Sequence, residues 1–526
     1  MRRLVHAARV IGLLLGFYAL CAAILAALIV GDVLVTQQAG STPALDREVA
    51  ILYALTAVAL YIVIRAVFVS TRVRHRDVIG IMVSERDEPA LWDRVRFLAR
   101  SVGTRAPKRI YLVPDVNAAV WENTRLLGLI PGRRNMMIGA PLLMALTPAQ
   151  FDSVVAHELG HYGNRDTRVG ALDNRARGSV MAAVAAAQGR LRRSTGKDGK
   201  PRRLRLPGQS AYVALFQAYG RLVLSVTQEA SRRQEYAADR VAAEIAGRAN
   251  AASALREMPA IEAAFAFYLD RYVAIGMDRK LLPPPAEVLG GFAAMLAEPA
   301  RQREMDELRG DPTAEAPDPF DSHPAVLDRI AAIERLPDDG RPVDTSGARA
   351  LSILSNPPSA MAAIGLRMLE KAGAGAQAVD WDTLANTTAA ERAARSSDPL
   401  RNATAMLYGT PVPLSGFLDA VDAGRLGQIL DQMPPSDAAK NANATGRVAR
   451  EFAKTSIAPM LYGWALAELA AQGRVRWRNS WADVGGDLQI STELASSLRK
   501  AVEAVTAVTP DAAQMRAVVY AMGVPA

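Results

Sequence analysis

The chain has 526 residues and a formal net charge of +9, and half of its residues are hydrophobic. Its single cysteine, Cys21, excludes an internal disulfide and a zinc site built from several cysteines, so any metal site must use histidines and carboxylates. The length exceeds that of one compact domain, and the basic balance suits either nucleic acid or an anionic membrane surface.

Two apolar runs near the N-terminus predict two membrane-spanning helices. Residues 10–30 carry no charged side chain, and residues 49–70 carry only Arg65, near the end of the run. Each run is about long enough to cross a bilayer as a helix. Arginines precede the first run and follow the second, so the positive-inside bias places both ends in the cytoplasm. The sequence thus predicts a transmembrane hairpin over residues 1–76 in a multi-pass protein of the inner (plasma) membrane, with the remaining chain facing the cytoplasm.

Two alternatives exist for these runs. Residues 1–23 also have the arginine pair, apolar core and small residues of a cleaved signal peptide. Both runs could instead form the buried hairpin of a soluble domain. The signal peptide leaves the second apolar run and its following arginines unexplained, and uncharged runs of this length are uncommon in soluble domains. We therefore favour the membrane hairpin.

The sequence after residue 108 predicts two strands followed by a helix with clear N-terminal signals. Residues 109–115 are rich in strand-forming side chains, and residues 135–143 contain a second candidate strand. Thr147 is a good helix N-cap, Pro148 suits the first helical position, and Gln150 completes a capping box.

This helix carries the pentapeptide HELGH, with His157, Glu158 and His161. Histidines four residues apart project from one helix face and can bind one zinc ion, and the adjacent glutamate can reach the metal-bound water. Zinc lowers the pKa of that water to about 7, so the carboxylate can take its proton as it attacks a carbonyl. The alternative is a chance pattern on an exposed helix, but the apolar neighbours indicate a buried helix in which unpartnered histidines would be costly. We predict one Zn²⁺ per chain.

A catalytic zinc usually has three protein ligands and an open position, and two residues qualify as the third. Glu235 lies in a predicted helix over residues 227–247, among small residues that allow close helix packing. Asp239, one turn later, could accept a hydrogen bond from a ligand histidine. His323 is the other candidate ligand. Spacing alone does not decide between a metal site and a surface helix with i,i+4 charge pairs.

Four motifs in order carry a family resemblance: HELGH, NRD, RRQEYAADRVA and SHPAVLDRI. Together they resemble the membrane-associated zinc peptidases of family M48, which include the heat-shock protease HtpX and the CAAX prenyl proteases. The resemblance covers roughly residues 1–335. It implies a zinc-dependent metalloendopeptidase with a zincin-like domain, acting on unfolded or membrane proteins in membrane protein quality control.

The resemblance also implies roles for individual positions. It implies zinc ligands at His157, His161 and Glu235, a general base at Glu158 and an acidic partner at Asp239. His323 matches a histidine near the family's active site, where it could donate to the oxyanion; the alternative is a loop histidine that caps the next helix. Arg329 matches an arginine that gives structural support. Asn117, Ala118 and Ala119 match a strand edge with which an extended substrate would pair.

The chain departs from the family between its histidines and Glu235. HtpX-type enzymes carry further apolar spans there, whereas residues 178–189 are weakly apolar and residues 211–227 contain Arg221. We interpret the latter as an amphipathic helix leading into the Glu235 helix. Prenyl proteases have many spans and this chain has only two clear ones, which argues against a prenylated substrate.

A basic loop, residues 189–208, carries eight basic residues against one aspartate. It has no aromatic residue to stack on bases, which argues against single-stranded nucleic acid as a partner. Near a membrane the loop would contact anionic headgroups; the alternative is a solvated loop. Residues 301–322 are acidic and proline-rich and predict a loop at the rim of the cleft.

The composition of residues 336–349 predicts a linker. Residues 350–526 are predicted to form a helix-rich C-terminal domain, and they contain no catalytic motif. Four of the six tryptophans fall in this domain, and we interpret them as core or interface anchors. The domain could bind a protein partner.

The sequence thus predicts a mainly helical α+β protein. It has two N-terminal transmembrane helices, a metallopeptidase domain with a small sheet over residues 77–335, and the helical C-terminal domain. The rival function is a non-catalytic, zinc-containing membrane scaffold, against which the intact Glu158 argues, because a structural zinc site needs no base. A nucleic-acid binder rests on net charge alone, and we predict no nucleic-acid partner.

Overall fold

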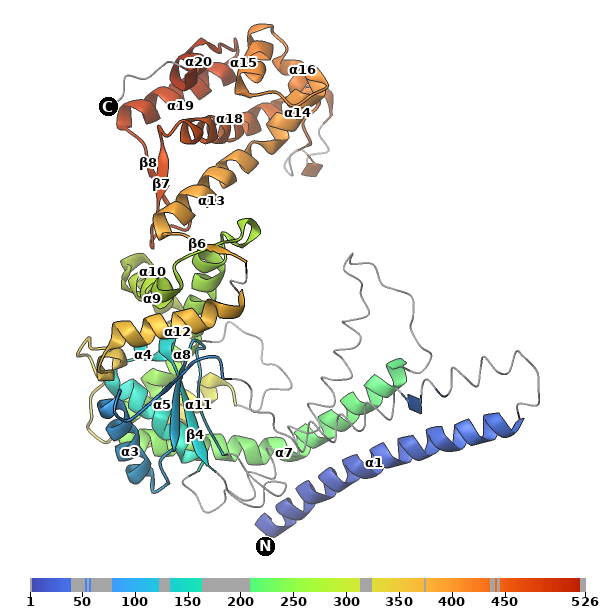
Figure 1. The fold of residues 1–526 in the computed structure, drawn as a ribbon, viewed down its shortest axis with the longest axis vertical. Coiled ribbons are helices and arrows are strands. Elements are labelled where there is room, and N and C mark those ends of the chain that lie inside the picture. The colour runs from blue at the N-terminus through green and yellow to red at the C-terminus, as the bar shows by residue number, and fades with distance from the viewer. Residues whose placement is uncertain are drawn as a thin grey trace. The chain divides into compact units, whose positions relative to one another are not determined.

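The computed structural model describes residues 2–38, 53, 56–57, 78–122, 133–162, 209–312, 324–372, 375–435, 440–441 and 445–520. Figure 1 shows them as a ribbon. Helices dominate, together with one four-stranded sheet and two short two-stranded sheets, which confirms the predicted mainly helical α+β class. The chain divides into two compact units. The first unit comprises Met1–Phe265 and Glu304–Met368, and the second comprises Ala266–Arg303 and Leu369–Ala526.

The N-terminal helix α1, Arg2–Gln38, contains the first predicted membrane span. The second predicted span lies outside the described residues except for Tyr53, Thr56 and Ala57, which are helical. Across the helices that the structure describes, none combines the length and the apolar character required to cross a bilayer. Both spans therefore stay predictions. The weakly apolar run 178–189 and the basic loop also lie outside the described residues.

The four-stranded sheet lies in the first unit, after α1 in chain order. Its strands are β1 (Ile81–Val83), β2 (Arg109–Val113), β3 (Ala118–Glu122) and β4 (Arg134–Gly139). The order is β1-β2-β4-β3, with β2 and β4 parallel and the outer pairs antiparallel. The predicted strands are confirmed as β2 and β4. Strand β3 is an edge strand, so one of its sides does not pair within this sheet.

Helices cover this sheet and build the first unit with it. They are α3 (Pro89–Val102), α4 (Ala140–Ala145), α5 (Pro148–Gly160), α7 (Gln209–Ala246), most of α8 (Arg248–Tyr268) and α11 (Val326–Glu334). Helix α5 packs against α7, α3 and β3. The predicted amphipathic helix and the Glu235 helix are one continuous helix, α7.

The predicted capping box at the start of α5 is confirmed. The Thr147 hydroxyl accepts from the amide of Gln150 at 3.3 Å, and the Gln150 side chain accepts from the Thr147 amide at 2.9 Å. Pro148 occupies the first helical turn. These bonds satisfy two amides that a helix N-terminus leaves without intrahelical partners, and they fix where the HELGH helix begins.

The segment after α11, residues 336–350, binds the ends of three helices, and we call it the strap. Arg341 donates to backbone carbonyls at the C-terminus of α7 at 2.8 Å. Asp339 accepts from the first amide of α8 at 3.1 Å, and Asp344 accepts from the amide of Ala149 at the start of α5 at 3.4 Å. The charges match the helix ends that they contact, an arginine at a C-terminus and aspartates at N-termini.

The second unit has its own core and is built from short helices and two small sheets. Its helices include α9 (Val288–Ala297), α13 (Trp381–Ser396), α14 (Asp398–Tyr408), α15 (Leu414–Asp422), α16 (Leu426–Asp431), α18 (Gly446–Ala471), α19 (Thr492–Thr506) and α20 (Ala513–Tyr520). Strands β5 (Leu281–Leu282) and β6 (Gln377–Ala378) pair in parallel, and β7 (Arg476–Arg478) pairs with β8 (Asp487–Gln489). Helices α10 (Pro299–Gly310) and α12 (Pro357–Ala372) contain residues of both units.

Two of the four tryptophans of the second unit are buried in its core, and the other two are partly buried and lie in an aromatic cluster. Trp464 and Trp477 are buried in its hydrophobic core. The rings of Trp381 and Trp481 lie 5.0 Å apart, centre to centre, and both pack against Tyr268.

The predicted loop over residues 301–322 was wrong in its first part, which belongs to α10. Residues 301–309 read RQREMDELR, in which nearly every residue is a good helix former, and Pro299 occupies the first position of the helix. Acidic composition and later prolines masked this local helix propensity in the sequence.

Candidate metal centre

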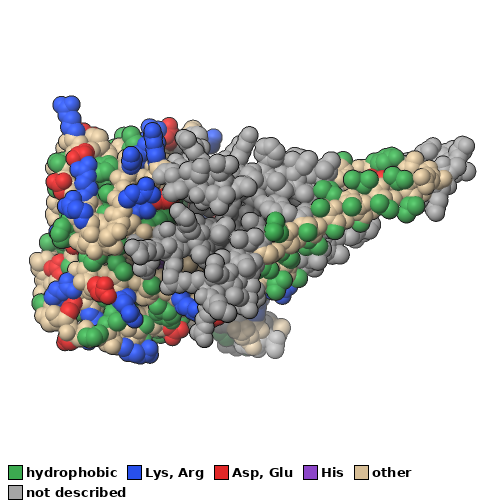
Figure 2. Space-filling view, turned by 90° about the horizontal axis from the view of Figure 1, so that it is seen from below, with side chains coloured by type: hydrophobic (Ala, Val, Ile, Leu, Met, Phe, Trp, Pro, Cys, Tyr) green, Lys and Arg blue, Asp and Glu red, His purple; other side chains and the backbone are tan. Residues whose placement is uncertain are grey.

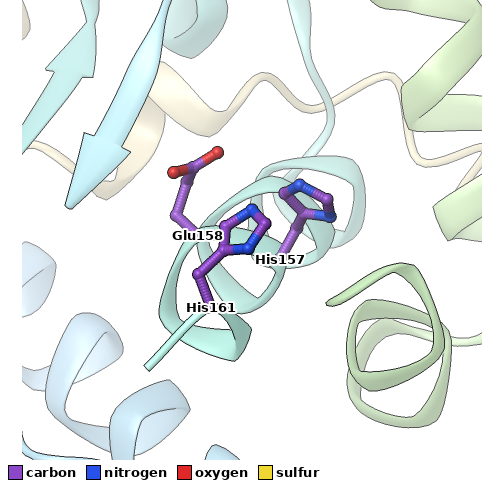
Figure 3. Close-up of side chains that lie close together, drawn as sticks. All are labelled: His157, Glu158 and His161. Atoms are coloured by element: carbon purple, nitrogen blue, oxygen red, sulfur yellow. The ribbon is translucent and has the colours of Figure 1, made fainter. Parts of the chain in front are cut away.

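Three potential metal ligands lie together at the C-terminal end of α5. The ligand atoms of His157, Glu158 and His161 are all within 4.8 Å of one another. Figure 3 shows the three side chains projecting from the same end of the helix. The two imidazole rings meet nearly edge to face, with centroids 4.8 Å apart and an interplanar angle of 86°. The helical spacing therefore brings the ligand atoms of these three side chains close together, as expected from the sequence.

A second helix brings Glu235 to both histidines. Its Oε2 lies 3.5 Å from Nε2 of His157, and its Oε1 lies 3.7 Å from Nε2 of His161. Ligand atoms about 2.0–2.2 Å from a tetrahedral zinc ion would lie about 3.3–3.6 Å from each other. Two nitrogens and a carboxylate at these separations fit the donor set and the size of a zinc site. The structure thus places Glu235, one of the two candidate third ligands, beside the histidine pair.

Small residues let α5 and α7 approach closely enough for this geometry. A Cβ atom added at Gly160 would lie 3.3 Å from the Cα of Ala238 on α7, and Ala238 is buried. Because the nearest atom is backbone, α7 would have to move to accept a larger residue. Gly160 therefore sets the distance between the histidine helix and Glu235.

We expect Gly160→Val to weaken zinc binding by at least about tenfold, because shifted helices move Glu235 away from the histidines and displaced metal ligands cost affinity. Zinc titration by competition with a chelator would measure the change. The control is Gly290→Val, since a Cβ at Gly290 would meet no atom within 4 Å. Equal zinc affinity in both variants would show that the helix separation does not control the site.

A buried carboxylate fixes the orientation of the first histidine. Asp239 Oδ1 lies 3.0 Å from Nδ1 of His157. This contact places a proton on Nδ1, which donates to the aspartate, and leaves Nε2, the atom next to Glu235, as the metal donor. Asp239 is itself held by Arg329, whose guanidinium donates to both carboxylate oxygens at 2.7 and 2.9 Å. Arg329 and Asp239 are buried and form a hydrogen-bonded series that ends at the partly buried His157.

The protonation of this hydrogen-bonded series follows from its partners. Burial lowers the pKa of His157, but hydrogen bonds to Asp239 and Glu235 outweigh it and raise that pKa to about 9. Burial raises the pKa of Asp239, but the hydrogen bonds from Arg329 and His157 outweigh it and lower that pKa. Asp239 is therefore a carboxylate at neutral pH, and a metal ion must displace a proton from His157.

Arg329 comes closer to the site than the sequence indicated. One of its terminal nitrogens lies 3.4 Å from both ring nitrogens of His157 and 3.7 Å from Oε2 of Glu235. It therefore contacts a metal-ligand candidate directly as well as supporting Asp239. His323, the other candidate third ligand and the candidate oxyanion donor, lies outside the described residues.

The edge strand β3 presents a defined set of backbone groups. The amide of Gly139 donates to the carbonyl of Asn117 at 2.8 Å, and Ala118 lies opposite Ile138. Because opposed residues of antiparallel strands alternate between bonded and non-bonded pairs, the Asn117 carbonyl and the backbone groups of Ala119 face β4. The amide and carbonyl of Ala118 therefore point away from the sheet, along the outer edge.

One residue at this edge was missed by the sequence analysis. Tyr162 directly follows His161, and its hydroxyl donates to the carbonyl of Val120 on β3 at 2.9 Å. Its position next to HELGH was the only sequence signal, because a contact with β3 depends on tertiary packing.

Residues 85–336 of the chain match the family model described as Peptidase family M48. Two relatives that match over segments of similar length are each named protease HtpX homolog. That of Pelotomaculum thermopropionicum is 28% identical over 165 residues, 31% of this chain and 56% of the relative. That of Pyrococcus abyssi is 31% identical over 179 residues, 34% of this chain and 58% of the relative.

A longer match has the same name. The protease HtpX homolog of Pseudarthrobacter chlorophenolicus is 26% identical over 275 residues, 52% of this chain and 81% of the relative. The chain thus spans less than two thirds of the other two relatives. No solved structure gives a significant match.

Proposed function

The chain carries a peptidase family M48 domain over residues 85–336, and on this premise we propose that it is a zinc-dependent metalloendopeptidase. The observation that carries the proposal is the proximity of Glu235 to His157 and His161, next to Glu158, the acid–base candidate on the same helix as the histidines. A purely structural zinc site would have no use for that fourth group.

The donor set supports zinc as the metal. Two imidazoles and one carboxylate are the protein ligands of many catalytic zinc sites, which keep a further position open. His157, His161 and Glu235 would hold one Zn²⁺ per chain. When bound, zinc supplies a Lewis acid that polarises the peptide carbonyl and acidifies water.

The other steps of the proposed hydrolysis depend on side chains of this protein. Glu158 takes a proton from the attacking water and transfers it to the amine that leaves, as a positioned carboxylate can. Asp239 and Arg329 keep the His157 ring in one orientation, so that Nε2 stays directed at Glu235. His323 donates a hydrogen bond to the developing oxyanion.

Polypeptide substrates would bind in an extended conformation along β3. The outward amide and carbonyl of Ala118 would exchange backbone hydrogen bonds with the substrate, as in other cases of strand addition. Asn117 and Ala119 would contribute to this subsite by holding β3 to β4, Asn117 through its carbonyl and Ala119 through its inward backbone groups. Backbone pairing selects unfolded chains over folded ones.

The proposed test is metal content. We expect wild-type protein to contain one zinc ion per chain by mass spectrometry and Glu235→Ala to have lost most of it. The matched control is Glu229→Ala, which changes a glutamate of the same helix whose side chain is exposed. Full zinc occupancy in Glu235→Ala would remove it as a ligand and point to His323. Absence of zinc in wild type would overturn the proposed activity.

We also propose that α1 anchors the chain to the inner membrane, with the catalytic domain facing the cytoplasm. The support is the uncharged run 10–30 and the exposure of large apolar side chains on α1, including Leu15, Ile29 and Val30. Figure 2 shows hydrophobic side chains along this helix. Such side chains gain free energy when they leave water for lipid.

Alkaline extraction of cell membranes tests the anchor. We expect the full chain to stay in the membrane pellet and a chain lacking residues 1–76 to appear in the supernatant, because the remaining chain has no comparable uncharged run. Extraction of the full chain into the supernatant would contradict the anchor and leave the metal site unaffected.

A further inference from the structure

The Tyr162 side chain occupies a backbone group that a bound peptide would otherwise use. Its hydroxyl donates to the Val120 carbonyl at 2.9 Å. Val120 lies opposite Met136 and two residues from Ala118, so by the same alternation its carbonyl points away from β4. The hydrogen bond from Tyr162 agrees with that direction independently. Tyr162 therefore sits on the outer edge of β3.

The position of Tyr162 is fixed from two further sides. Its backbone carbonyl accepts from the Thr104 hydroxyl at 3.0 Å, and its ring lies under the guanidinium of Arg134, 4.6 Å from the ring centre. Arg134 is buried and is held by Glu122, directly across the strand pair, at 2.7 Å. Moving the ring would break a cation–π contact and expose this buried network.

We propose that Tyr162 is a specificity-determining residue that ends the substrate-pairing edge of β3 after Ala118. The inference rests on the proposed peptidase function and deepens it. A strand that pairs with β3 needs the carbonyls of Ala118 and Val120 in turn, because alternate residues face the edge. Tyr162 blocks the second position both with its ring and by its hydrogen bond. A bound substrate therefore pairs over a short stretch and must leave the sheet edge at Val120.

The block at Val120 limits the number of backbone hydrogen bonds that a polypeptide can form with β3. Only one substrate amide would donate to β3 on this side of the site, the one that faces Ala118. Extending a peptide past that point would add no backbone hydrogen bond. A short pairing stretch admits exposed or locally unfolded segments of a protein and does not require a long unfolded chain.

A scan of backbone N-methylation tests the inference. The probe is a fluorogenic peptide that the zinc-loaded full-length protein cleaves, selected from a casein digest, with one amide methylated at a time. In wild type we expect one amide facing β3 to be sensitive, with kcat/KM roughly threefold to tenfold lower when it is methylated, and the amide two residues further toward Val120 to be insensitive. In Tyr162→Ala we expect that second amide to become sensitive by a similar factor.

Two controls separate the edge effect from general damage. Tyr162→Phe removes the hydrogen bond to the Val120 carbonyl but keeps the ring, and we expect the ring alone to maintain the wild-type pattern. Tyr111→Phe removes a tyrosine hydroxyl from β2, on the far side of β4, and should also change nothing. Zinc content and the melting temperature of each variant show whether its site is intact.

The outcomes are distinct. Identical patterns in wild type and Tyr162→Ala, with the unmodified peptide still cleaved, would overturn the role of Tyr162 and leave the peptidase function standing. If Tyr162→Ala does not fold, the wild-type scan decides alone, because sensitivity at two alternate amides toward Val120 would refute the block. If zinc-loaded wild type cleaves no peptide, the proposed function itself fails.

Discussion

Glu158→Gln is expected to lower kcat for peptide hydrolysis by at least about a hundredfold, with one zinc ion per chain retained. Removing a positioned general base commonly lowers the rate by about 10²–10⁴, and glutamine has nearly the same shape but cannot accept the proton. Zinc stays bound because the proposed ligands are the two histidines and Glu235. Cleavage of a fluorogenic peptide and metal analysis of the same sample would measure both quantities.

The matched control for this substitution is Glu229→Gln, on α7, whose side chain is exposed. It should hydrolyse the peptide at the wild-type rate. If Glu158→Gln retains the wild-type rate, another group is the base. If wild type itself has zinc but no hydrolytic activity, the scaffold alternative gains support, because a loaded site that does not hydrolyse peptides has only a structural role.

Asp239→Asn is the second substitution with a large expected effect, on stability and on zinc affinity together. It would leave the buried Arg329 guanidinium without its carboxylate, and breaking a buried ion pair costs about 3–5 kcal/mol in the free energy of unfolding. It would also free the His157 ring to rotate, and loss of such a supporting carboxylate lowers metal affinity by about 10- to 100-fold.

Urea denaturation and a chelator competition would measure the two effects separately. The control is Asp431→Asn, which removes a carboxylate from an exposed pair with Arg450 in the second unit, where solvent screening makes such pairs weak. A stable Asp239→Asn protein with wild-type zinc affinity would show that Arg329 and His157 need no carboxylate between them.

The local half of the site was predictable from the sequence because it lies on a single helix. Thr147 and Gln150 mark where α5 begins, and helical periodicity then places His157 and His161 on one face. The strand prediction succeeded for the same reason, since residues 109–115 carry the composition of a strand in one short run.

The other half depends on contacts between distant segments. Whether Glu235 or His323 completes the ligand set could not be decided by spacing, because the answer depends on how closely Gly160 lets α7 approach α5. The same holds for Tyr162, whose role follows from the register of β3 against β4. A one-residue shift of that register would turn the Val120 carbonyl inward.

The prediction for the residues of α10 was wrong for a different reason. The first residues of this helix were assigned to a loop from the composition of a longer window, in which later prolines outweighed a run of good helix formers. Local propensity at residues 301–309 decided the structure.

The strap carries a consequence for the order of events during synthesis. Asp344 contacts the start of the HELGH helix from 195 residues further along the chain, and at about 5–20 residues per second this separation takes roughly 10–40 s to translate. Until then the ends of α5, α7 and α8 lack these partners. The contacts at these three helix ends therefore form late, and the first unit is completed only after the strap has been synthesised.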